Sequence, residues 1–355
     1  MSRFLNGRYA TTVPYVPGEQ PKGRDFVKLN ANESPYPPSP KVLEALDKPL
    51  VDGMRRYADP RCLPLRQAFA NRAGVPVEWV FAANGSDEAL AFVFLTFFHT
   101  DTPLVFPDVT YSFYHDYCGA FNVPFREVPL RDDLTIDVDS LIAQHAHVVL
   151  PNPNAPTGYV LPVAEIERLC DALPDRLVVI DEAYVDFGNE SCVPAVSRHD
   201  NLVVVQTFSK SRNLAGAHVG FAIAQQAIID DIRDVKFCFD PFNVSAATQA
   251  IGMASLADEP YFRSCTQRIV ETRDRTIARL RAMGFTVTGS HANFLFATRD
   301  DVDPQEWNAY LRQEGILARY FSAPRTCRWL RVSIGADEDM DRFVAATERF
   351  LRTPE

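Results

Sequence analysis

The sequence has no long apolar segment and no apolar core near its beginning. Its longest apolar run, residues 89–98, is interrupted by Thr96 and reaches only about half the length of a membrane-spanning helix. Residues 1–7 contain polar and charged side chains where a secretory signal peptide has a continuous apolar stretch. The chain is therefore expected to be neither membrane-embedded nor secreted.

Paired cysteines and metal-binding motifs are also missing. The seven cysteines are an odd number, contain no Cys-x-x-Cys pair and mostly lie within apolar stretches. The histidines show no metal-ligand spacing on an expected helix or strand. There is no Gly-x-Ser-x-Gly elbow of a serine hydrolase. We expect a protein of the reducing cytoplasm with no metal ion.

Basic charge is scarce. The 36 Lys and Arg residues against 46 Asp and Glu residues give a net charge of −10, which argues against a protein that neutralises the phosphates of a nucleic acid. A length of 355 residues with 46% apolar content is enough for two hydrophobic cores. The expected partners are small molecules.

The chain divides by composition into an arm and two domains. Residues 1–38 are rich in proline and glycine and are expected to form an extended arm. A helix capped by Ser39 is expected next, with apolar residues at helical spacing through Leu50. We assign residues 39–245, where short apolar runs alternate with helical segments, to a large domain and residues 246–355 to a smaller α+β domain.

The large domain has the pattern of an α/β fold. Residues 148–150, 177–180 and 202–205 are continuously apolar, as are strands that helices cover on both faces. This indicates a largely parallel sheet between two layers of helices. Ligands of such sheets bind at the carboxyl ends of the strands.

Three groups of polar residues follow expected strands. Asp181 and Glu182 end a buried strand, where a charged acid needs a partner. Lys210 follows another strand and could act as a nucleophile, or it could be a solvated strand-end lysine. In residues 84–87 a strand turns into a helix whose free amides can hold an anion, although Ser86 is equally suited to be a plain N-cap.

Together these groups describe a pocket for a phosphorylated, electron-poor aromatic aldehyde. The helix start would hold a phosphate, the acid a ring nitrogen and the lysine a carbonyl carbon, which is the chemistry of pyridoxal phosphate. The sequence resembles the fold-type I pyridoxal-phosphate aminotransferases, and within them the histidinol-phosphate aminotransferase group. The resemblance rests on an ordered series of motifs, in residues 14–18, 28–36, 56–60, 65–68, 85–88, 107–111, 151–158, 181–184, 209–216, 292–294 and 330–335.

The resemblance implies a mostly parallel sheet of the seven-stranded type between helices, with a smaller α+β domain. It also implies roles for single residues. Lys210 would bind the cofactor covalently and move a proton between the substrate Cα and the cofactor, while Asp181 would pair with the protonated pyridine nitrogen. Tyr184 would contact the ring oxygen, and Tyr111 would stack on the ring. The cofactor phosphate would be held by Gly85, Ser86, Asp87, Ser209 and, from a second subunit, Tyr57.

The substrate would be bound from the opposite side of the cavity. By the resemblance, Arg319 and Arg331 stand where the family binds the anionic end of its substrate, with Asn32 and Tyr15 of the arm nearby. Surface salt bridges for the arginines and core packing for the tyrosine are the alternatives. The expected partners are thus an amino donor, a 2-oxo acid and a second copy of the chain in a homodimer.

The sequence departs from the family at two positions. Ala155 stands where the family commonly has the asparagine that contacts the ring oxygen, so Asn154 is the candidate for this role. His218 replaces the arginine of the family's Leu-Ala-Gly-x-Arg motif, and Arg212 is the candidate substitute. A histidine is charged only part of the time near neutral pH and cannot form a two-pronged bond to phosphate. Weaker or more pH-sensitive cofactor retention is therefore expected.

The leading functional hypothesis is transfer of an amino group between L-histidinol phosphate and 2-oxoglutarate in histidine biosynthesis. The same motifs are compatible with an aromatic amino-acid aminotransferase or a threonine-phosphate decarboxylase-like enzyme, because the orientation of the substrate on the cofactor decides which bond at Cα breaks. A non-catalytic relative with weakened cofactor binding is a further alternative. The joint presence of Lys210, Asp181 and Tyr184 argues against it.

Overall fold

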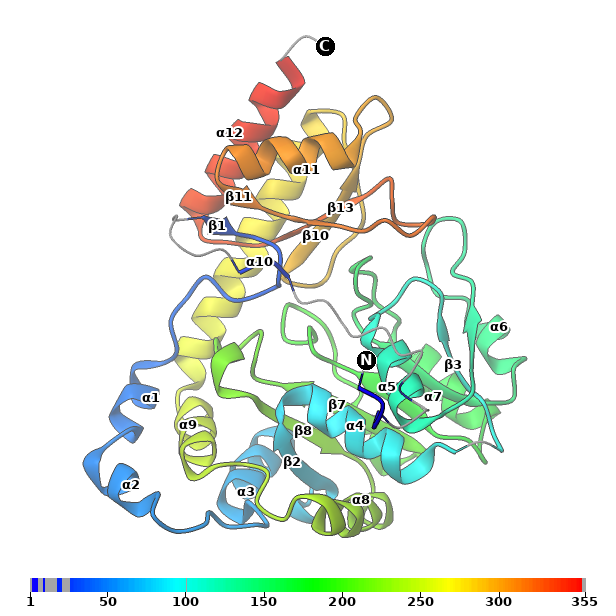
Figure 1. The fold of residues 1–355 in the computed structure, drawn as a ribbon, viewed down its shortest axis with the longest axis vertical. Coiled ribbons are helices and arrows are strands. Elements are labelled where there is room, and N and C mark those ends of the chain that lie inside the picture. Colours follow the sequence, from blue (N-terminus) through cyan, green and yellow to red (C-terminus); the bar gives the residue numbers. More distant parts are fainter. Residues whose placement is uncertain (1, 6–8, 10–17, 21–25, 100, 353–355) are drawn as a thin grey trace.

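Seven strands form the central sheet of the computed structural model, which describes residues 2–5, 9, 18–20, 26–99 and 101–352 (Figure 1). The strands lie in the order β2-β8-β7-β6-β5-β3-β4. Neighbouring strands are parallel, except that β8 runs antiparallel to both β2 and β7. The mostly parallel sheet that the apolar runs predicted is confirmed. Its strands are β2 Val80–Asn84, β3 Leu104–Pro107, β4 Phe125–Val128, β5 His147–Pro151, β6 Val178–Asp181, β7 Leu202–Thr207 and β8 Val219–Ile223.

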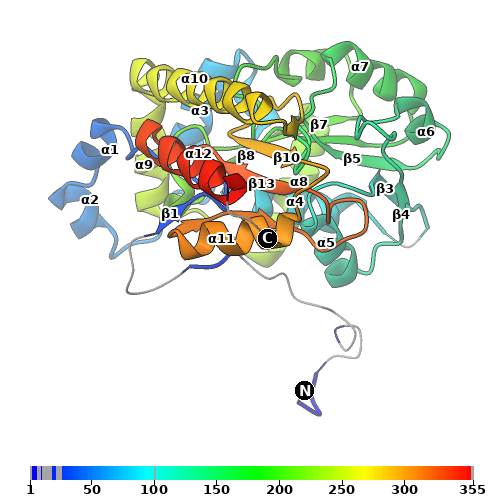
Figure 2. The same cartoon turned by 90° about the horizontal axis from the view of Figure 1, so that it is seen from above.

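Helices cover both faces of this sheet (Figures 1 and 2). Successive side chains of a strand point to opposite faces, so that Val204 packs into one apolar core and Val203 and Val205 pack into the other. This explains why the strands are apolar at every position. The first core is shared by α3 Leu63–Ala73, α6 Val138–Ile142 and α7 Val163–Ala172, and the second by α4 Gly85–Phe97, α5 Phe113–Phe121 and α8 Gln226–Phe239.

A smaller antiparallel sheet follows in the chain, in the order β12-β13-β10-β9. Three helices share its core, through buried side chains such as Ile269, Trp307 and Phe343. These elements are β9 Thr286–Val287, β10 Phe294–Thr298, β12 Arg319–Tyr320, β13 Leu330–Ser333, α10 Glu259–Ala282, α11 Pro304–Gln313 and α12 Asp337–Arg352. Within the described ranges, no helix is both long and apolar enough to cross a membrane.

The N-terminal region contributes more structure than an extended arm. β1 (Val27–Lys28) pairs in parallel with β11 (Ile316–Leu317), so the arm is joined to the C-terminal part of the chain.

The single helix expected after Ser39 is instead two short helices, α1 (Pro40–Ala45) and α2 (Lys48–Gly53). A further helix, α9 (Ala246–Leu256), precedes α10 in the chain. Ser39 caps α1 as predicted, since its Oγ accepts a hydrogen bond from the Lys41 amide at 3.2 Å. The prediction of one continuous helix was wrong because Asp47 caps a second helix through the Leu50 amide, at 2.8 Å.

Candidate active site

A cavity lies where the carboxyl ends of three central strands meet the second sheet and the N-terminal arm. Pro151, Asp181 and Thr207 are the last residues of β5, β6 and β7, and all three line it. This is the edge at which ligands of parallel sheets bind. The other lining residues are Gly18, Asn30, Ala31, Asn32, Ser86, Asp87, Tyr111, Ala155, Ala183, Tyr184, Ser209, Lys210, Arg319 and Arg331. The cavity therefore gathers most of the residues that the sequence singled out.

Asp181 is a buried acid at the floor of the cavity, with 4% of its surface exposed. Its carboxylate accepts hydrogen bonds from the Tyr114 hydroxyl at 3.3 Å and the Ala183 amide at 3.1 Å. Burial, reinforced by the negative charge of Asp87, raises the pKa of Asp181 to about 7, although the two hydrogen bonds and the Lys210 ammonium oppose this. Among the described residues no cation forms an ion pair with it, so the site is suited to a cationic ring nitrogen.

Lys210 presents its amine to the same cavity. It follows β7 in the turn that begins with Phe208 and Ser209, and its Nζ donates a hydrogen bond to the Ala31 carbonyl of the arm at 3.4 Å. Thr207 steadies this turn, because its hydroxyl oxygen accepts a hydrogen bond from the Ser209 amide at 3.2 Å. A primary amine held this way can attack an aldehyde carbon bound in the cavity.

The start of α4 forms the anion-binding end of the cavity. The side chain of the N-cap residue Asn84 forms no capping hydrogen bond, and Ser86 and Asp87 face the cavity. The first amides of a helix have no partner within the helix and favour a negative charge. Gly85 begins the helix at a φ of +76°, and a β-carbon on Gly220 of β8 would lie 2.2 Å from the Gly85 carbonyl carbon. The turn is thus packed directly on β8.

Asn32 is the best anchored residue of the cavity wall. Its φ of +54° is unusual for a residue other than glycine. Its Nδ2 donates to the Tyr184 hydroxyl at 2.9 Å, and its amide and Oδ1 bond the Ser333 hydroxyl at 2.8 and 2.9 Å. Asn293 donates to its carbonyl at 2.9 Å. These contacts hold the phenol of Tyr184 toward the cavity and join the arm to β13.

Two arginines line the opposite wall. Arg319 on β12 and Arg331 on β13 are directly paired in the sheet register. Arg331 donates to the Asn30 carbonyl at 3.0 Å and lies over the rings of Phe294 and Phe321. Both arginines therefore line the cavity, and their binding of an anionic substrate group stays a prediction.

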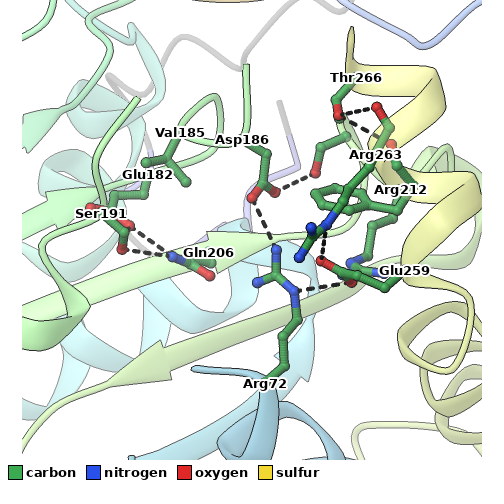
Figure 3. Close-up of polar contacts among 12 residues, drawn as sticks. Arg72, Glu182, Val185, Asp186, Ser191, Gln206, Arg212, Glu259, Arg263 and Thr266 are labelled. Atoms are coloured by element: carbon green, nitrogen blue, oxygen red, sulfur yellow. Dashed lines mark hydrogen bonds and ion pairs between the residues drawn. The ribbon is translucent and has the colours of Figure 1, made fainter. Parts of the chain in front are cut away.

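Arg212 lies away from this cavity, and the expectation that it substitutes for a phosphate-binding arginine is corrected. Figure 3 shows its guanidinium directed to Glu259 in a separate polar cluster. It donates to Glu259 at 2.7 Å and to the Ser255 carbonyl at 2.8 Å, and it stacks on Phe262. The turn after Lys210 directs Arg212 to the other side, where the Ser211 hydroxyl also donates to Asp186 at 2.6 Å.

Asn154 does not line the cavity either. It is fully buried, and its Nδ2 donates to the Val109 carbonyl and the Thr157 hydroxyl, both at 3.0 Å, while its Oδ1 accepts from Thr110 at 3.3 Å. These bonds use its amide to shape the loop, and the neighbouring Ala155 faces the cavity instead. The geometry therefore does not support Asn154 as the contact of the ring oxygen.

Three further predicted residues lie at the margin or beyond. His218 is exposed, and its Nδ1 is 3.6 Å from the position that a β-carbon on Gly85 would take, so it stands beside the anion-binding turn. Tyr57 is 83% exposed and stacks on Phe242, outside the cavity of its own chain. Tyr15 lies outside the described residues.

Some lining residues were not singled out by the sequence analysis. Asn30 lies within the recognised motif 28–36 and Thr207 stands just before the motif 209–216, so both could have been included on that basis. Tyr114, which holds the Asp181 carboxylate, and Gly220, which packs against the anion-binding turn, act only through contacts between distant segments. No sequence spacing indicates those contacts.

These residues fit pyridoxal phosphate. The cavity combines a buried acid without a cationic partner among the described residues, an amine on a strand end, and free amides at the start of α4. They match the ring nitrogen, the aldehyde and the phosphate of that cofactor. The fold and the cavity together define the class of pyridoxal-phosphate-dependent transferases.

Comparison with known proteins identifies the family. Residues 24–346 match the family described as "Aminotransferase class I and II". Histidinol-phosphate aminotransferase 1 of Bordetella parapertussis is 46% identical over 354 residues, which cover 99% of each chain. Histidinol-phosphate aminotransferase of Acinetobacter baumannii is 46% identical over 345 residues, or 96% of each chain.

Solved structures agree with this match. The histidinol-phosphate aminotransferase of Sinorhizobium meliloti, crystallised in complex with pyridoxal-5′-phosphate, superimposes with a TM-score of 0.84 at 26% identity, over 93% of this chain and 92% of that one. The chain belongs to the class I and II aminotransferase family, and the predicted fold class, enzyme class and cofactor are confirmed.

Proposed function

We propose that this aminotransferase interconverts L-histidinol phosphate and 2-oxoglutarate with imidazole-acetol phosphate and L-glutamate, a step of histidine biosynthesis. The observation that carries the proposal is the cavity itself, in which Lys210 and Asp181 face an anion-binding helix start on one side and two arginines on the other. The near full-length similarity to histidinol-phosphate aminotransferases supports this choice of substrate.

Three residues of the cavity, Asp181, Lys210 and Tyr184, have a defined task in such a reaction. Bound pyridoxal phosphate supplies an electron-withdrawing ring and an aldehyde carbon that receives the amino group. Asp181 holds the proton on the ring nitrogen, which keeps the ring electron-poor. With the cofactor bound, Lys210 would take the proton from the substrate Cα and deliver it to the cofactor carbon that carried the aldehyde. Tyr184, fixed by Asn32, donates its hydroxyl proton toward the ring oxygen.

The substrate is oriented by charge. Histidinol phosphate and 2-oxoglutarate both carry an anionic group at a distance from the reacting carbon, and Arg319 and Arg331 offer guanidinium groups suited to phosphate and carboxylate. A substrate held at this end presents its Cα to Lys210. Arg331 gains rigidity from the Asn30 carbonyl and from the two aromatic rings beneath it.

We also infer a homodimer in which Tyr57 completes the phosphate site of the second subunit. Tyr57 is 83% exposed and stacks on Phe242, which is 40% exposed, and an exposed aromatic pair of this kind is suited to contact with a second subunit. The neighbouring parts of the sequence also carry exposed apolar side chains, namely Leu43, Leu46, Val51, Met54, Leu63 and Phe239. Sedimentation should give twice the chain mass. Tyr57→Ala should lower the affinity for pyridoxal phosphate.

The substrate is tested by incubating the enzyme with histidinol phosphate and 2-oxoglutarate. Formation of glutamate and imidazole-acetol phosphate in equal amounts supports the proposal. Carbon dioxide released from threonine phosphate would point to the decarboxylase-like alternative, and a higher kcat/KM for phenylalanine or tyrosine would point to an aromatic aminotransferase. Absence of a visible cofactor band and of any turnover would favour the non-catalytic alternative.

A further inference from the structure

The strand that carries Arg319 is held by little within its own sheet, whereas β13, which carries Arg331, pairs along its length with β10. β12 is two residues long, lies at the edge of the sheet and pairs only with β13 in the described part of the chain. Residues 321–329 connect the two strands and extend toward the central sheet (Figure 1). The position of Arg319 therefore depends on where this connecting segment is anchored.

Arg325 supplies that anchor. Its Nη1 donates to the Asp108 carboxylate at 2.7 Å and to the Leu130 carbonyl at 3.0 Å, and its Nη2 donates to the Arg131 carbonyl at 3.0 Å. Asp108 directly follows β3, whereas Leu130 and Arg131 follow β4. One side chain of the second sheet thus reaches two strand ends of the central sheet.

The receiving site is rigid. The Asp108 amide donates to the Val128 carbonyl at 3.1 Å, and its Oδ1 accepts a hydrogen bond from the Leu130 amide at 2.9 Å. Its second oxygen is left for the guanidinium. A planar guanidinium can satisfy a carboxylate and two carbonyls together, which a lysine ammonium on a flexible stem does less well.

The bridge also borders a second cavity that continues the first. Residues 108–112 line one side of it and residues 319–323 the other. The two cavities share Tyr111, Ala155, Arg319 and Arg331. Loss of the bridge would free one wall of this joint space, and it is the wall that carries the substrate-binding arginines.

We propose that Arg325 is a positioning residue for substrate binding, which holds β12, and with it Arg319, at a fixed distance from Tyr111 and Lys210. The inference rests on the proposed function, in which these two arginines bind the anionic end of the substrate. Arg325 touches neither substrate nor cofactor. It acts through the connecting segment, so its removal should weaken substrate binding and leave the cofactor site unchanged.

The experiment compares Arg325→Ala with Arg328→Ala in the holoenzyme. Arg328 lies in the same segment but forms an exposed ion pair with Asp300 at 3.1 Å, which makes it a matched control. Arg325→Ala should raise the KM for histidinol phosphate about tenfold and change kcat by less than about twofold, whereas Arg328→Ala should match the wild type. Arg325→Lys should give an intermediate KM. Calorimetric titration of histidinol phosphate into a Lys210→Ala background should show the same loss of affinity for Arg325→Ala.

Asp108→Asn tests the bridge from its other end, because asparagine keeps an acceptor for the Leu130 amide and loses the charge. The double variant with Arg325→Ala should be no worse than Arg325→Ala. A lower thermal stability with unchanged KM in Arg325→Ala would show a purely structural role and overturn the proposal.

Arg331→Ala separates this outcome from a failure of the proposed function. If Arg331→Ala raises the KM but Arg325→Ala behaves like Arg328→Ala, only the role of Arg325 is refuted. If Arg331→Ala leaves the KM unchanged, the proposed substrate binding itself is wrong.

Discussion

Replacing Asp181 by asparagine is expected to stabilise the cofactor-free protein, and the effect should grow with pH. Burial, with the charge of Asp87, raises the pKa of this carboxyl from 3.8 to about 7. The folded protein then binds this proton more tightly than the unfolded chain does. Its free energy of unfolding therefore falls as the pH rises from the unfolded-state pKa of 3.8 through the folded-state pKa of about 7. The difference between the two pKa values corresponds to about 4 kcal/mol as an upper limit.

The assay is urea unfolding of the cofactor-free wild type and Asp181→Asn across this pH range. Groups that are not coupled to Asp181 titrate alike in both proteins, so the difference in free energy of unfolding reports Asp181 together with its interactions with Asp87 and Lys210. The variant should gain about 2 kcal/mol over the wild type near pH 5 and about 4 kcal/mol near pH 8.5, if all of the penalty is relieved. A difference that does not change with pH would refute the reasoning.

Addition of pyridoxal phosphate should reverse the order. The cationic ring nitrogen needs the carboxylate as its partner, and it relieves the cost of an ionised buried acid. The cofactor should therefore stabilise the wild type more than Asp181→Asn, as measured by the rise in melting temperature on adding it. Equal rises in both proteins would show that Asp181 does not face the ring nitrogen.

Three other changes have clear expected outcomes. His218→Arg should tighten binding of pyridoxal phosphate and flatten its pH dependence near neutrality, because an arginine stays charged; fluorescence titrations at several pH values that show no difference would contradict this. Gly220→Ala should abolish tight cofactor binding, since its β-carbon would lie 2.2 Å from the Gly85 carbonyl carbon, whereas Gly216→Ala, with open space around it, should bind normally in the same titration. Asn32→Ala should lower the free energy of unfolding by about 1–3 kcal/mol, because the side-chain hydrogen bonds are lost. Asn32→Gly loses the same hydrogen bonds but should lower the free energy of unfolding less, because glycine tolerates the φ of +54°. Equal denaturant midpoints for the two variants would argue against a contribution from the backbone conformation.

The sequence predicted the strands that are buried on both faces but did not predict β4, β8 or β12. β5, β6 and β7 were recognisable because every residue is apolar, while β4 is mostly exposed and β12 has only two residues. β8 contains Gly220, which favours no strand by propensity and is explained only by its contact with Gly85.

The candidate site also contains residues that the sequence could predict and residues that it could not. Lys210 and Asp181 were predictable because each lies at or shortly after the carboxyl end of an apolar strand, and the carboxyl ends of parallel strands meet at one edge. Arg212 was misassigned because nearness to Lys210 in sequence does not tell which side of a turn a side chain takes. Its partner Glu259 and the bridge from Arg325 to Asp108 join distant segments, and these contacts exist only in the folded chain.

The assignment of Lys210 as the amine that binds pyridoxal phosphate is tested most directly by borohydride reduction of the holoenzyme followed by mass analysis of its peptides. The predicted result is a single phosphopyridoxyl group on Lys210, with none in Lys210→Ala, which should also be inactive. A label on Lys236 or another lysine, or amino transfer that survives in Lys210→Ala, would contradict the assignment.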